Sequence, residues 1–167
     1  MRGHAARRWW PWLVTSLTVG SDQATKAAIH ACLSPTQSLP LIPPVLWLTY
    51  VQNTGAAFGL FRGHSIVFVL VSVMIAAWIL MELTRRRHRR WPIQLGLSLI
   101  LGGAVGNLID RLRVGYVVDF IDVRVWPVFN LADSAITVGV GLLLVTHTGL
   151  WPRLRRAKPP HAISTLP

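Results

Sequence analysis

The sequence predicts a mainly α-helical integral membrane protein with four transmembrane helices and a small extracytoplasmic β element. Hydrophobic residues make up 52% of its 167 residues, a share too high for a soluble domain of this size. Four apolar stretches are long enough to cross a hydrocarbon core, which needs about 20 helical residues. Two further segments are rich in β-favouring residues. We therefore expect a single polytopic membrane domain over residues 1–167.

The predicted spans cover about residues 9–31, 65–83, 92–108 and 131–151. Arg7 and Arg8 precede the first span, as in a secretory or twin-arginine export signal. The three later spans favour a retained first helix instead. In the third span, Gly102 and Gly106 form a Gly-x-x-x-Gly pattern, which lets another helix approach closely. Residues 157–167 are expected to form a disordered cytoplasmic tail.

The basic residues decide the predicted orientation. A formal net charge of +11 could by itself suit a nucleic-acid-binding protein, but most of the charge lies in short blocks beside the apolar runs. The blocks hold twelve of the 17 Lys and Arg residues: Arg2, Arg7 and Arg8; Arg85, Arg86, Arg87, Arg89 and Arg90; Arg153, Arg155, Arg156 and Lys158. Such blocks retain loops in the cytoplasm. We therefore expect both termini to be cytoplasmic and no nucleic-acid partner.

Two segments then lie on the outer side of the membrane. Residues 32–63 contain the run 45–51, which is rich in β-favouring residues and too short to span as a helix. A turn signal, Asn53-Thr-Gly55, follows it. Residues 109–130 contain a second strand-like run at 116–123. We expect these runs to form a small β element that rests on the four helices.

Ionisable residues near the hydrocarbon are the first candidates for function, because the membrane penalises them. Asp22 and Lys26 are four residues apart on the first predicted helix, so they can pair on one face. Asn107 and Arg111 show the same spacing at the end of the third span, where Arg111 could bind a carboxylate. Glu82 lies beside an arginine block and is expected to be a surface charge partner.

Two aspartates are the strongest candidates for chemistry. Asp119 interrupts an apolar strand-like run, where aspartate is disfavoured, while Asp122 would point to the opposite face. Asp133 could simply form a capping box with Asn130 at the start of the fourth helix. If Asp119 and Asp133 instead share a dry site, one holds a proton while the other acts as a base. Such a pair suits peptide hydrolysis.

Other hydrolytic chemistries have weaker support in the sequence. It contains neither a His-Glu-x-x-His zinc motif nor a Gly-x-Ser-x-Gly nucleophile elbow, and its 6 histidines are scattered. The single cysteine, Cys32, is expected to be a small buried hydrophobe. Neither Cys32 nor Ser134 has a clear neighbouring base. We therefore expect no metal ion and no cofactor.

Several motifs together resemble the signature blocks of lipoprotein signal peptidase (signal peptidase II). They occur in the order of that family and extend from the first predicted span to the start of the fourth. The matching blocks are Asp22-Gln-Ala-Thr-Lys26, Asn53-Thr-Gly-Ala-Ala-Phe58, Gly102-Gly-Ala-Val-Gly-Asn107 with Asp110-Arg111, Gly115-Tyr-Val-Val-Asp-Phe120 and Phe129-Asn-Leu-Ala-Asp133. Gly20-Ser21 departs from the more apolar residues expected before the first block.

The resemblance implies a multi-pass enzyme of the bacterial cytoplasmic (inner) membrane, with four transmembrane helices, a periplasmic β-cradle and an active site near the outer face. It implies an aspartic endopeptidase whose catalytic residues are Asp119 and Asp133. Its substrates would be prolipoproteins already modified with diacylglyceryl, cut just before the lipidated cysteine. The other implied site residues, which bind substrate or support the site, are Asn53, Asn107, Arg111, Asn130, Asp22 and Lys26. Membrane lipid is an expected partner, and no obligate protein partner is expected.

Two other functions stay open at this point. The ionisable residues Asp22, Lys26 and Asp133 would also suit a small transporter or channel subunit. A membrane scaffold could bind lipoproteins without cutting them. Ion flux without cleavage would favour the transporter, and the absence of any cut product would favour the scaffold.

Overall fold

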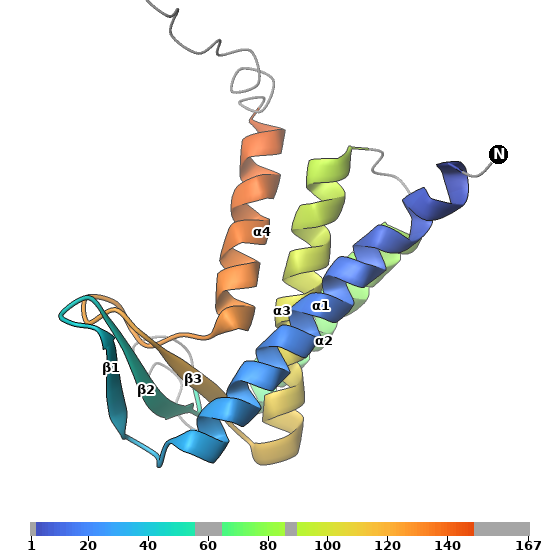
Figure 1. The fold of residues 1–167 in the computed structure, drawn as a ribbon. Helices are drawn as coiled ribbons and strands as arrows, with labels where there is room; N and C mark the ends of the chain where they lie inside the picture. The colour runs from blue at the N-terminus through green and yellow to red at the C-terminus, as the bar shows by residue number, and fades with distance from the viewer. Residues whose placement is uncertain (1–2, 56–64, 86–89, 149–167) are drawn as a thin grey trace, which may run out of the picture.

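The computed structural model describes residues 3–55, 65–85 and 90–148. Within these residues, four helices form a bundle and a three-stranded sheet lies at one end of it (Figure 1). The helices are α1 (Gly3–Cys32), α2 (Ser65–Arg85), α3 (Trp91–Val114) and α4 (Leu131–His147), and the strands are β1 (Ser38–Ile42), β2 (Leu46–Asn53) and β3 (Val117–Asp122). The predicted tail at 157–167 and the predicted end of the fourth span at 149–151 lie outside the described residues.

Helix α3 lies at the centre of the bundle, where it packs against α1, α2 and α4. Glycines make the close approach to α1 possible: a Cβ at Gly102 would lie 2.6 Å from the Cβ of Thr18, and one at Gly106 would lie 2.5 Å from Oδ2 of Asp22. The close approach predicted from these two glycines is confirmed. On its other side, α3 places Gly103 against the backbone of Ala132 at the start of α4.

Helix α3 extends beyond the predicted third span at about 92–108, because it continues to Val114. Arg111 and Arg113 lie in its last turn, where positive charge is favoured by the helix dipole. Gly115 then ends the helix with a φ of 81°, and its N–H donates to the carbonyl oxygen of Arg111 at 3.2 Å. Asp110, which the sequence assigned to an outer segment, therefore lies on the helix.

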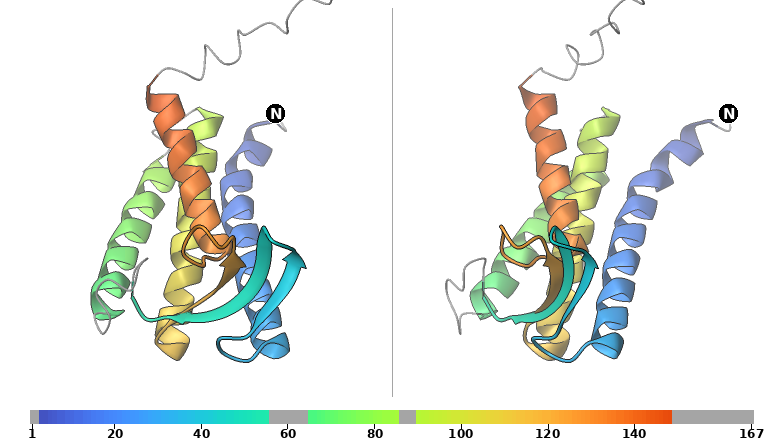
Figure 2. Two further views of the ribbon diagram at one scale, coloured as in Figure 1. Left: turned by 90° about the vertical axis from the view of Figure 1, so that its left-hand side faces the viewer. Right: turned by 60° about the vertical axis from the view of Figure 1, so that its left-hand side comes forward.

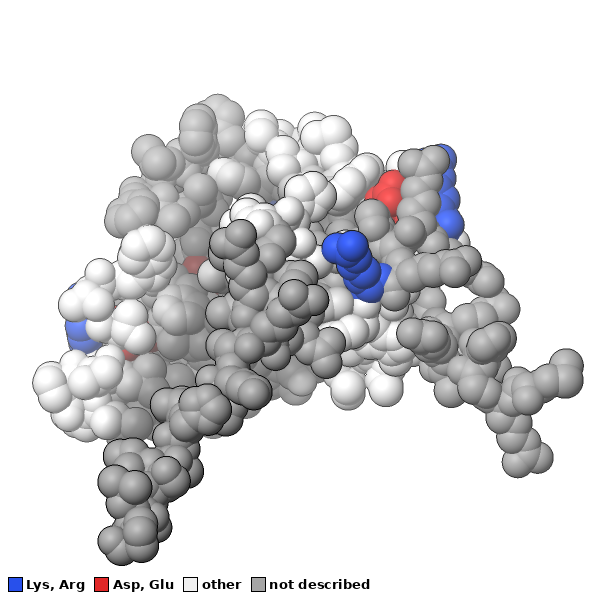
Figure 3. Space-filling view, turned by 90° about the horizontal axis from the view of Figure 1, so that it is seen from above, with Lys and Arg blue, Asp and Glu red and all other residues white. Residues whose placement is uncertain are grey.

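The helices are apolar to different degrees. Among the described residues, the helical segments Ile66–Thr84 and Trp91–Val114 are long and apolar enough to cross a membrane, while Leu131–His147 is apolar but shorter. Helix α1 has 30 residues and carries Asp22 and Lys26 in its second half. Seen from the end that lies away from the sheet, most of the described surface carries neither acidic nor basic side chains (Figure 3). The count of four spans stays a prediction.

The three strands pair antiparallel in the order β1-β2-β3. Strands β2 and β3 match the two predicted strand-like runs closely, and they place Val51 opposite Asp119 and Trp47 opposite Asp122. Strand β1 is an additional strand that the sequence did not predict, because Pro40 argues against a strand. Proline is tolerated there because β1 is the edge of the sheet.

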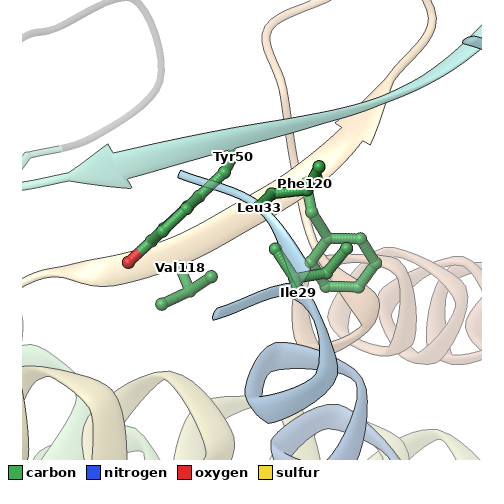
Figure 4. Packing of buried hydrophobic residues seen from close by; sticks show 5 residues of the cluster. All are labelled: Ile29, Leu33, Tyr50, Val118 and Phe120. Atoms are coloured by element: carbon green, nitrogen blue, oxygen red, sulfur yellow. The ribbon is translucent and has the colours of Figure 1, made fainter. Parts of the chain in front are cut away.

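A small hydrophobic cluster holds the sheet against the end of α1. Ile29 and Leu33 contact Tyr50 of β2 and Val118 and Phe120 of β3, and all five are buried (Figure 4). Figure 2 shows the curved sheet lying across the lower part of the bundle. Cys32, beside this cluster, is exposed. The expectation of a buried cysteine was wrong, because the last turn of α1 presents only some of its faces to the sheet.

Candidate active site

The first turn of α4 forms the capping box that its sequence predicts. The N–H of Asp133 donates to Oδ1 of Asn130 at 2.9 Å, and the N–H of Asn130 donates to Oδ2 of Asp133 at 3.2 Å. A third backbone donor, the N–H of Ala132, is bound by Oδ1 of Asp22 on α1 at 3.0 Å. Three backbone N–H groups at this helix start are therefore bound by three side chains, two of them carboxylates.

Capping accounts for only one oxygen of Asp133. Its other oxygen, Oδ1, accepts a hydrogen bond from Nδ2 of Asn107 on α3 at 2.8 Å. Both oxygens thus face fixed donors, one from the backbone of its own cap and one from the neighbouring helix. The capping and catalytic interpretations are compatible in this geometry.

Asp119 lies on β3 and contacts the same start of α4 through Asn130. Its side chain is buried, with a relative exposure of 2%. Oδ2 accepts a hydrogen bond from Nδ2 of Asn53 at 2.9 Å, and Oδ1 accepts one from Nδ2 of Asn130 at 2.7 Å. Asn130 therefore contacts both aspartates, Asp119 through its side chain and Asp133 through its backbone and its side-chain oxygen.

The environment of Asp119 favours its protonated form. Burial raises the pKa of this carboxyl from 3.8 to about 7, and the nearby charge of Asp133 acts in the same direction. Hydrogen bonds from Asn53 and Asn130, and the charge of Lys26, oppose the rise without cancelling it. A carboxyl that titrates near neutral pH can hold or release a proton under physiological conditions.

Lys26 occupies the centre of a buried polar cluster behind the aspartates. The Nζ of this residue lies 2.8 Å from Oδ2 of Asp22, 2.9 Å from Oδ2 of Asp110 and 2.9 Å from Oδ1 of Asn107. Its side chain has only 3% relative exposure. The predicted pairing of Asp22 with Lys26 is confirmed, and an ammonium group with three acceptors has no donor left over.

Two members of this cluster were not predicted as site residues. Asp110 accepts from the backbone N–H of Val118 at 3.1 Å, as well as from Lys26, and so ties α3 to β3. Gln23 donates to Oδ1 of Asp110 at 2.9 Å. The available signal was spacing: once the third helix is extended, Asp110 lies three residues after Asn107 on the same helix.

Arg111 behaves differently from the prediction. Among the described residues it forms no ion pair with a carboxylate; its Nη1 donates to the backbone oxygen of Asn107 at 3.4 Å, and its guanidinium lies 5.4 Å from the ring centre of Phe68. The extended helix places the side chain beside α2 rather than directly on an acid. Its charge still interacts with those of Asp133 and Asp119 over a longer distance.

Asp122 lies apart from this network, as the alternation of a strand predicts. It accepts hydrogen bonds from Oγ1 of Thr49 at 2.7 Å and from the backbone N–H of Arg124 at 2.9 Å. Burial alone would raise its pKa, but these bonds and the charge of Arg124 outweigh burial and lower it. Contacts between side chains thus join seven of the eight candidate site residues into one network, and Arg111 is attached to it only through the backbone oxygen of Asn107.

Within the described part of the chain, no group of three or more His, Cys, Asp or Glu side chains could hold a metal ion. The acids of the site are instead surrounded by amide and ammonium donors from Asn53, Asn107, Asn130 and Lys26. Donors of this kind satisfy carboxylates directly. The arrangement brings two carboxylates, Asp119 and Asp133, into one hydrogen-bonded site through Asn130.

A buried aspartate, Asp119, joined through Asn130 to the half-buried Asp133 at one end of a helix bundle, indicates the class of membrane-bound aspartic peptidases. Comparison with known families identifies the particular one. The family described as Signal peptidase (SPase) II matches residues 14–148 of this chain, and the chain therefore belongs to the signal peptidase II family. It is an enzyme, a hydrolase of the aspartic-peptidase type.

Individual relatives agree with this assignment. The chain is 52% identical to the lipoprotein signal peptidase of Moorella thermoacetica, over 78% of this chain and 87% of that protein. It is 48% identical to the lipoprotein signal peptidase of Pelotomaculum thermopropionicum, over 78% of this chain and 86% of that protein. A solved bacterial membrane enzyme superposes with a TM-score of 0.78 at 31% identity, covering 91% of this chain and 93% of the other.

Proposed function

We propose that Asp119 and Asp133 form the catalytic pair of an endopeptidase that removes signal peptides from diacylglyceryl-modified prolipoproteins, cutting before the lipidated cysteine. The observation that carries the proposal is Asn130, which donates to Asp119 and exchanges two hydrogen bonds with Asp133. One residue therefore holds both carboxylates in a fixed relation. Relatives named lipoprotein signal peptidase support the choice of substrate.

The proposed reaction needs one ionised and one protonated aspartate. The ionised carboxylate takes a proton from water as the water oxygen bonds to the scissile carbonyl carbon, and the protonated carboxyl gives its proton to the carbonyl oxygen. Collapse of the tetrahedral intermediate breaks the C–N bond, and a proton passes to the leaving amine. The raised pKa of Asp119 makes it the better candidate for the protonated member.

The remaining site residues hold this pair in place or lie beside it. Asn53 and Asn130 donate to Asp119, and Asn107 donates to Asp133. Arg111 lies beside the pair with its cation free of a direct carboxylate partner among the described residues, so it is suited to bind a polar group of the substrate. Asp22 and Lys26 support the site from behind.

The proposal includes the placement of the enzyme in the membrane. Four helices would cross the bacterial inner membrane as one polytopic domain, with both termini in the cytoplasm and the pair of aspartates near the outer face. In the sequence, the basic blocks adjoin the start of α1, the link between α2 and α3 and the end of α4, which supports this orientation. Substrate would then reach the aspartates from the outer leaflet, where its diacylglyceryl group resides.

The geometry disfavours the transporter alternative. An ion pathway requires polar groups that can exchange partners, whereas Lys26 is already bound to Asp22, Asp110 and Asn107. Asp133 is likewise held by two donors. These residues are arranged to stay in place rather than to release an ion.

Cleavage by the purified protein tests the proposal directly. The full chain in detergent, mixed with a diacylglyceryl-modified precursor, should release the signal peptide, and mass spectrometry should locate the cut before the lipidated cysteine. Chelators should leave turnover unchanged, because the proposed chemistry uses only carboxyl groups and water. Loss of activity on chelation, with recovery on adding a divalent ion, would contradict the two-aspartate mechanism. A precursor without diacylglyceryl serves as the control and should be cut poorly.

A further inference from the structure

The orientation of the Asn107 amide is set by its neighbours. An amide can point its oxygen or its NH₂ group in either direction unless a partner allows only one of them. Lys26 is such a partner: its ammonium only donates, and its Nζ lies 2.9 Å from Oδ1 of Asn107. The Nδ2 of Asn107 must then face Oδ1 of Asp133, at 2.8 Å.

The same oxygen of Asn107 also receives a donor from the other side of the site. Nδ2 of Asn130 lies 3.1 Å from Oδ1 of Asn107 and 2.7 Å from Oδ1 of Asp119. Lys26 therefore donates to the oxygen of Asn107, and the NH₂ group of Asn107 donates in turn to Asp133. A flipped Asn107 would present its oxygen to Asp133 and its NH₂ group to Lys26 and Asn130, so that three contacts would become repulsive at once.

We propose that Lys26 is a positioning residue, which fixes the amide of Asn107 so that it donates to Asp133 and keeps that carboxylate ready to accept a proton from water. The inference rests on the proposed function, because it assigns Lys26 a task within the catalytic pair. This role adds to the structural pairing of Lys26 with Asp22. The ammonium has three hydrogens, and the one directed to Asn107 fixes the orientation of that amide.

The charged groups near the pair define what a pH measurement would report. In the described part of the chain they are Asp22 and Lys26 from α1, Asp110 and Arg111 from α3, and the two aspartates themselves. Strand β2 contributes the neutral Asn53. A variant that removes Lys26 must therefore balance the cluster charge, or buried carboxylates left without a cation will unfold the protein.

The test uses a pair of variants that both lack the Asp110 carboxylate. Asp110→Asn alone keeps the lysine and supplies the matched baseline. Adding Lys26→Gln removes one positive charge, which returns the cluster to its native net charge, and places an amide that can either donate to Asn107 or accept from it. Each protein is assayed in detergent with a diacylglyceryl-modified precursor for kcat, KM and the pH dependence of kcat, with thermal unfolding as the measure of folding.

We expect the double variant to lose kcat by roughly 10-fold to 100-fold relative to Asp110→Asn, with KM nearly unchanged, because the catalytic pair rather than substrate binding is disturbed. The acidic limb of its kcat profile should move to higher pH, since an oxygen directed at Asp133 disfavours the ionised carboxylate. In a background that carries both Asp110→Asn and Asn107→Ala, adding Lys26→Gln should have little further effect, because its target is already gone. Equal kcat and equal pH profiles in the matched pair would overturn the inference. Effects that simply multiply with those of Asn107→Ala would also overturn it, because they indicate an unrelated structural role.

A second variant covers the case in which the double variant does not fold. Asn107→Asp keeps an oxygen for Lys26 but removes the donor toward Asp133, so it should show the same shift of the acidic limb, and a native limb would overturn the inference. Asp119→Asn, assayed in parallel, separates the two levels of the proposal. Substantial cleavage by Asp119→Asn would contradict the proposed function itself. If Asp119→Asn is inactive and the double variant has the kcat and pH profile of Asp110→Asn, only the role of Lys26 is contradicted.

Discussion

Among single residues, Asn130 combines a structural role with a place in the proposed catalytic pair. It starts α4 by binding the N–H of Asp133, and the NH₂ group of the same side chain binds Asp119. A capping residue normally contributes about 1 kcal/mol to stability. Here the cap also sets the position of two carboxylates, so one side chain links the stability of the helix to the geometry of the pair.

The first residue-scale prediction concerns the pair itself. Replacing either Asp119 or Asp133 with Asn keeps the shape of the side chain but removes the acid or the base, so each change alone should abolish cleavage. The double variant should be scarcely worse, because members of one catalytic unit are not additive. Rates of precursor cleavage, normalised to folded protein, measure this. Asp122→Asn is the matched control on the same strand and should stay active, since Asp122 contacts Thr49 and Arg124 rather than the pair.

Substantial turnover by Asp119→Asn or Asp133→Asn would contradict the assignment of the pair. If Asp133 served only as a cap, its Asn variant would lose at most about 1 kcal/mol of stability and keep its activity. The two roles therefore predict different outcomes for one substitution.

The second residue-scale prediction concerns pH and stability. The pKa of Asp119 is about 7 in the folded protein, above its ordinary value of 3.8. The folded state therefore binds a proton that the unfolded state releases between these values, so the stability it gives is full below the lower value and is lost as pH rises through the higher one. Asp119→Asn cannot ionise. Its unfolding midpoint relative to the native protein should thus be higher at about pH 8 than at about pH 5. A difference that does not change with pH would contradict the raised pKa.

At the scale of elements, the contact between α1 and α3 positions the polar cluster. Gly106 leaves room for Asp22, whose oxygens bind Lys26 and the N–H of Ala132 at the start of α4. Gly106 on α3 thus lets the carboxylate of Asp22 on α1 bind the start of α4. No local sequence rule predicts this contact, which joins residues 110 positions apart.

Two glycine substitutions test this packing. At Gly106, an alanine Cβ would lie 2.5 Å from Oδ2 of Asp22, whereas at Gly141 on α4 nothing lies within 4 Å of the new atom. Gly106→Ala should cost about 1–3 kcal/mol through overpacking and should lower cleavage, because Asp22 must move. Gly141→Ala should be neutral or stabilise by up to about 1 kcal/mol, because alanine favours a helix. Unfolding midpoints and cleavage rates compare the two. Equal behaviour would show that the contact with Asp22 does not matter.

Local sequence patterns predicted some of these elements and contacts and missed others. Periodicity and spacing were sufficient for the pair Asp22 and Lys26, for the cap at Asn130 and for two of the three strands, because each depends on neighbours along the chain. The edge strand β1 was not predicted, since its proline, Pro40, is acceptable only at an edge that the sequence cannot locate. Asp110 was placed in a loop for a similar reason: the helix ends at Gly115, beyond the apolar run that marked the predicted span.

At the scale of the whole molecule, the alternation of the helices places functional groups at one end. The end of α1, the end of α3 and the sheet lie together, while the start of α1 and the end of α4 point the other way (Figure 1). The contacts that join Asp119 on β3 to Asn107 on α3 and Asp133 on α4 run through Asn130. The site therefore exists only when the sheet and at least two helices are assembled, which explains why the sequence could name its residues but not their connections.

The last prediction concerns the orientation of the whole molecule in the membrane. Twelve of the 17 Lys and Arg residues lie in the three blocks defined above, and in an alternating four-span topology all three blocks fall on one side. Basic residues are retained in the cytoplasm, so reporter fusions after His147 and at Arg90 should give a cytoplasmic signal, and a fusion near Asn53 should give a periplasmic one. Neutralising the block at Arg85 and Arg90 should weaken this preference, whereas neutralising Arg113 on the opposite side should not. A cytoplasmic signal near Asn53 would place the aspartates on the wrong side for exported precursors and would contradict both the topology and the proposed substrate.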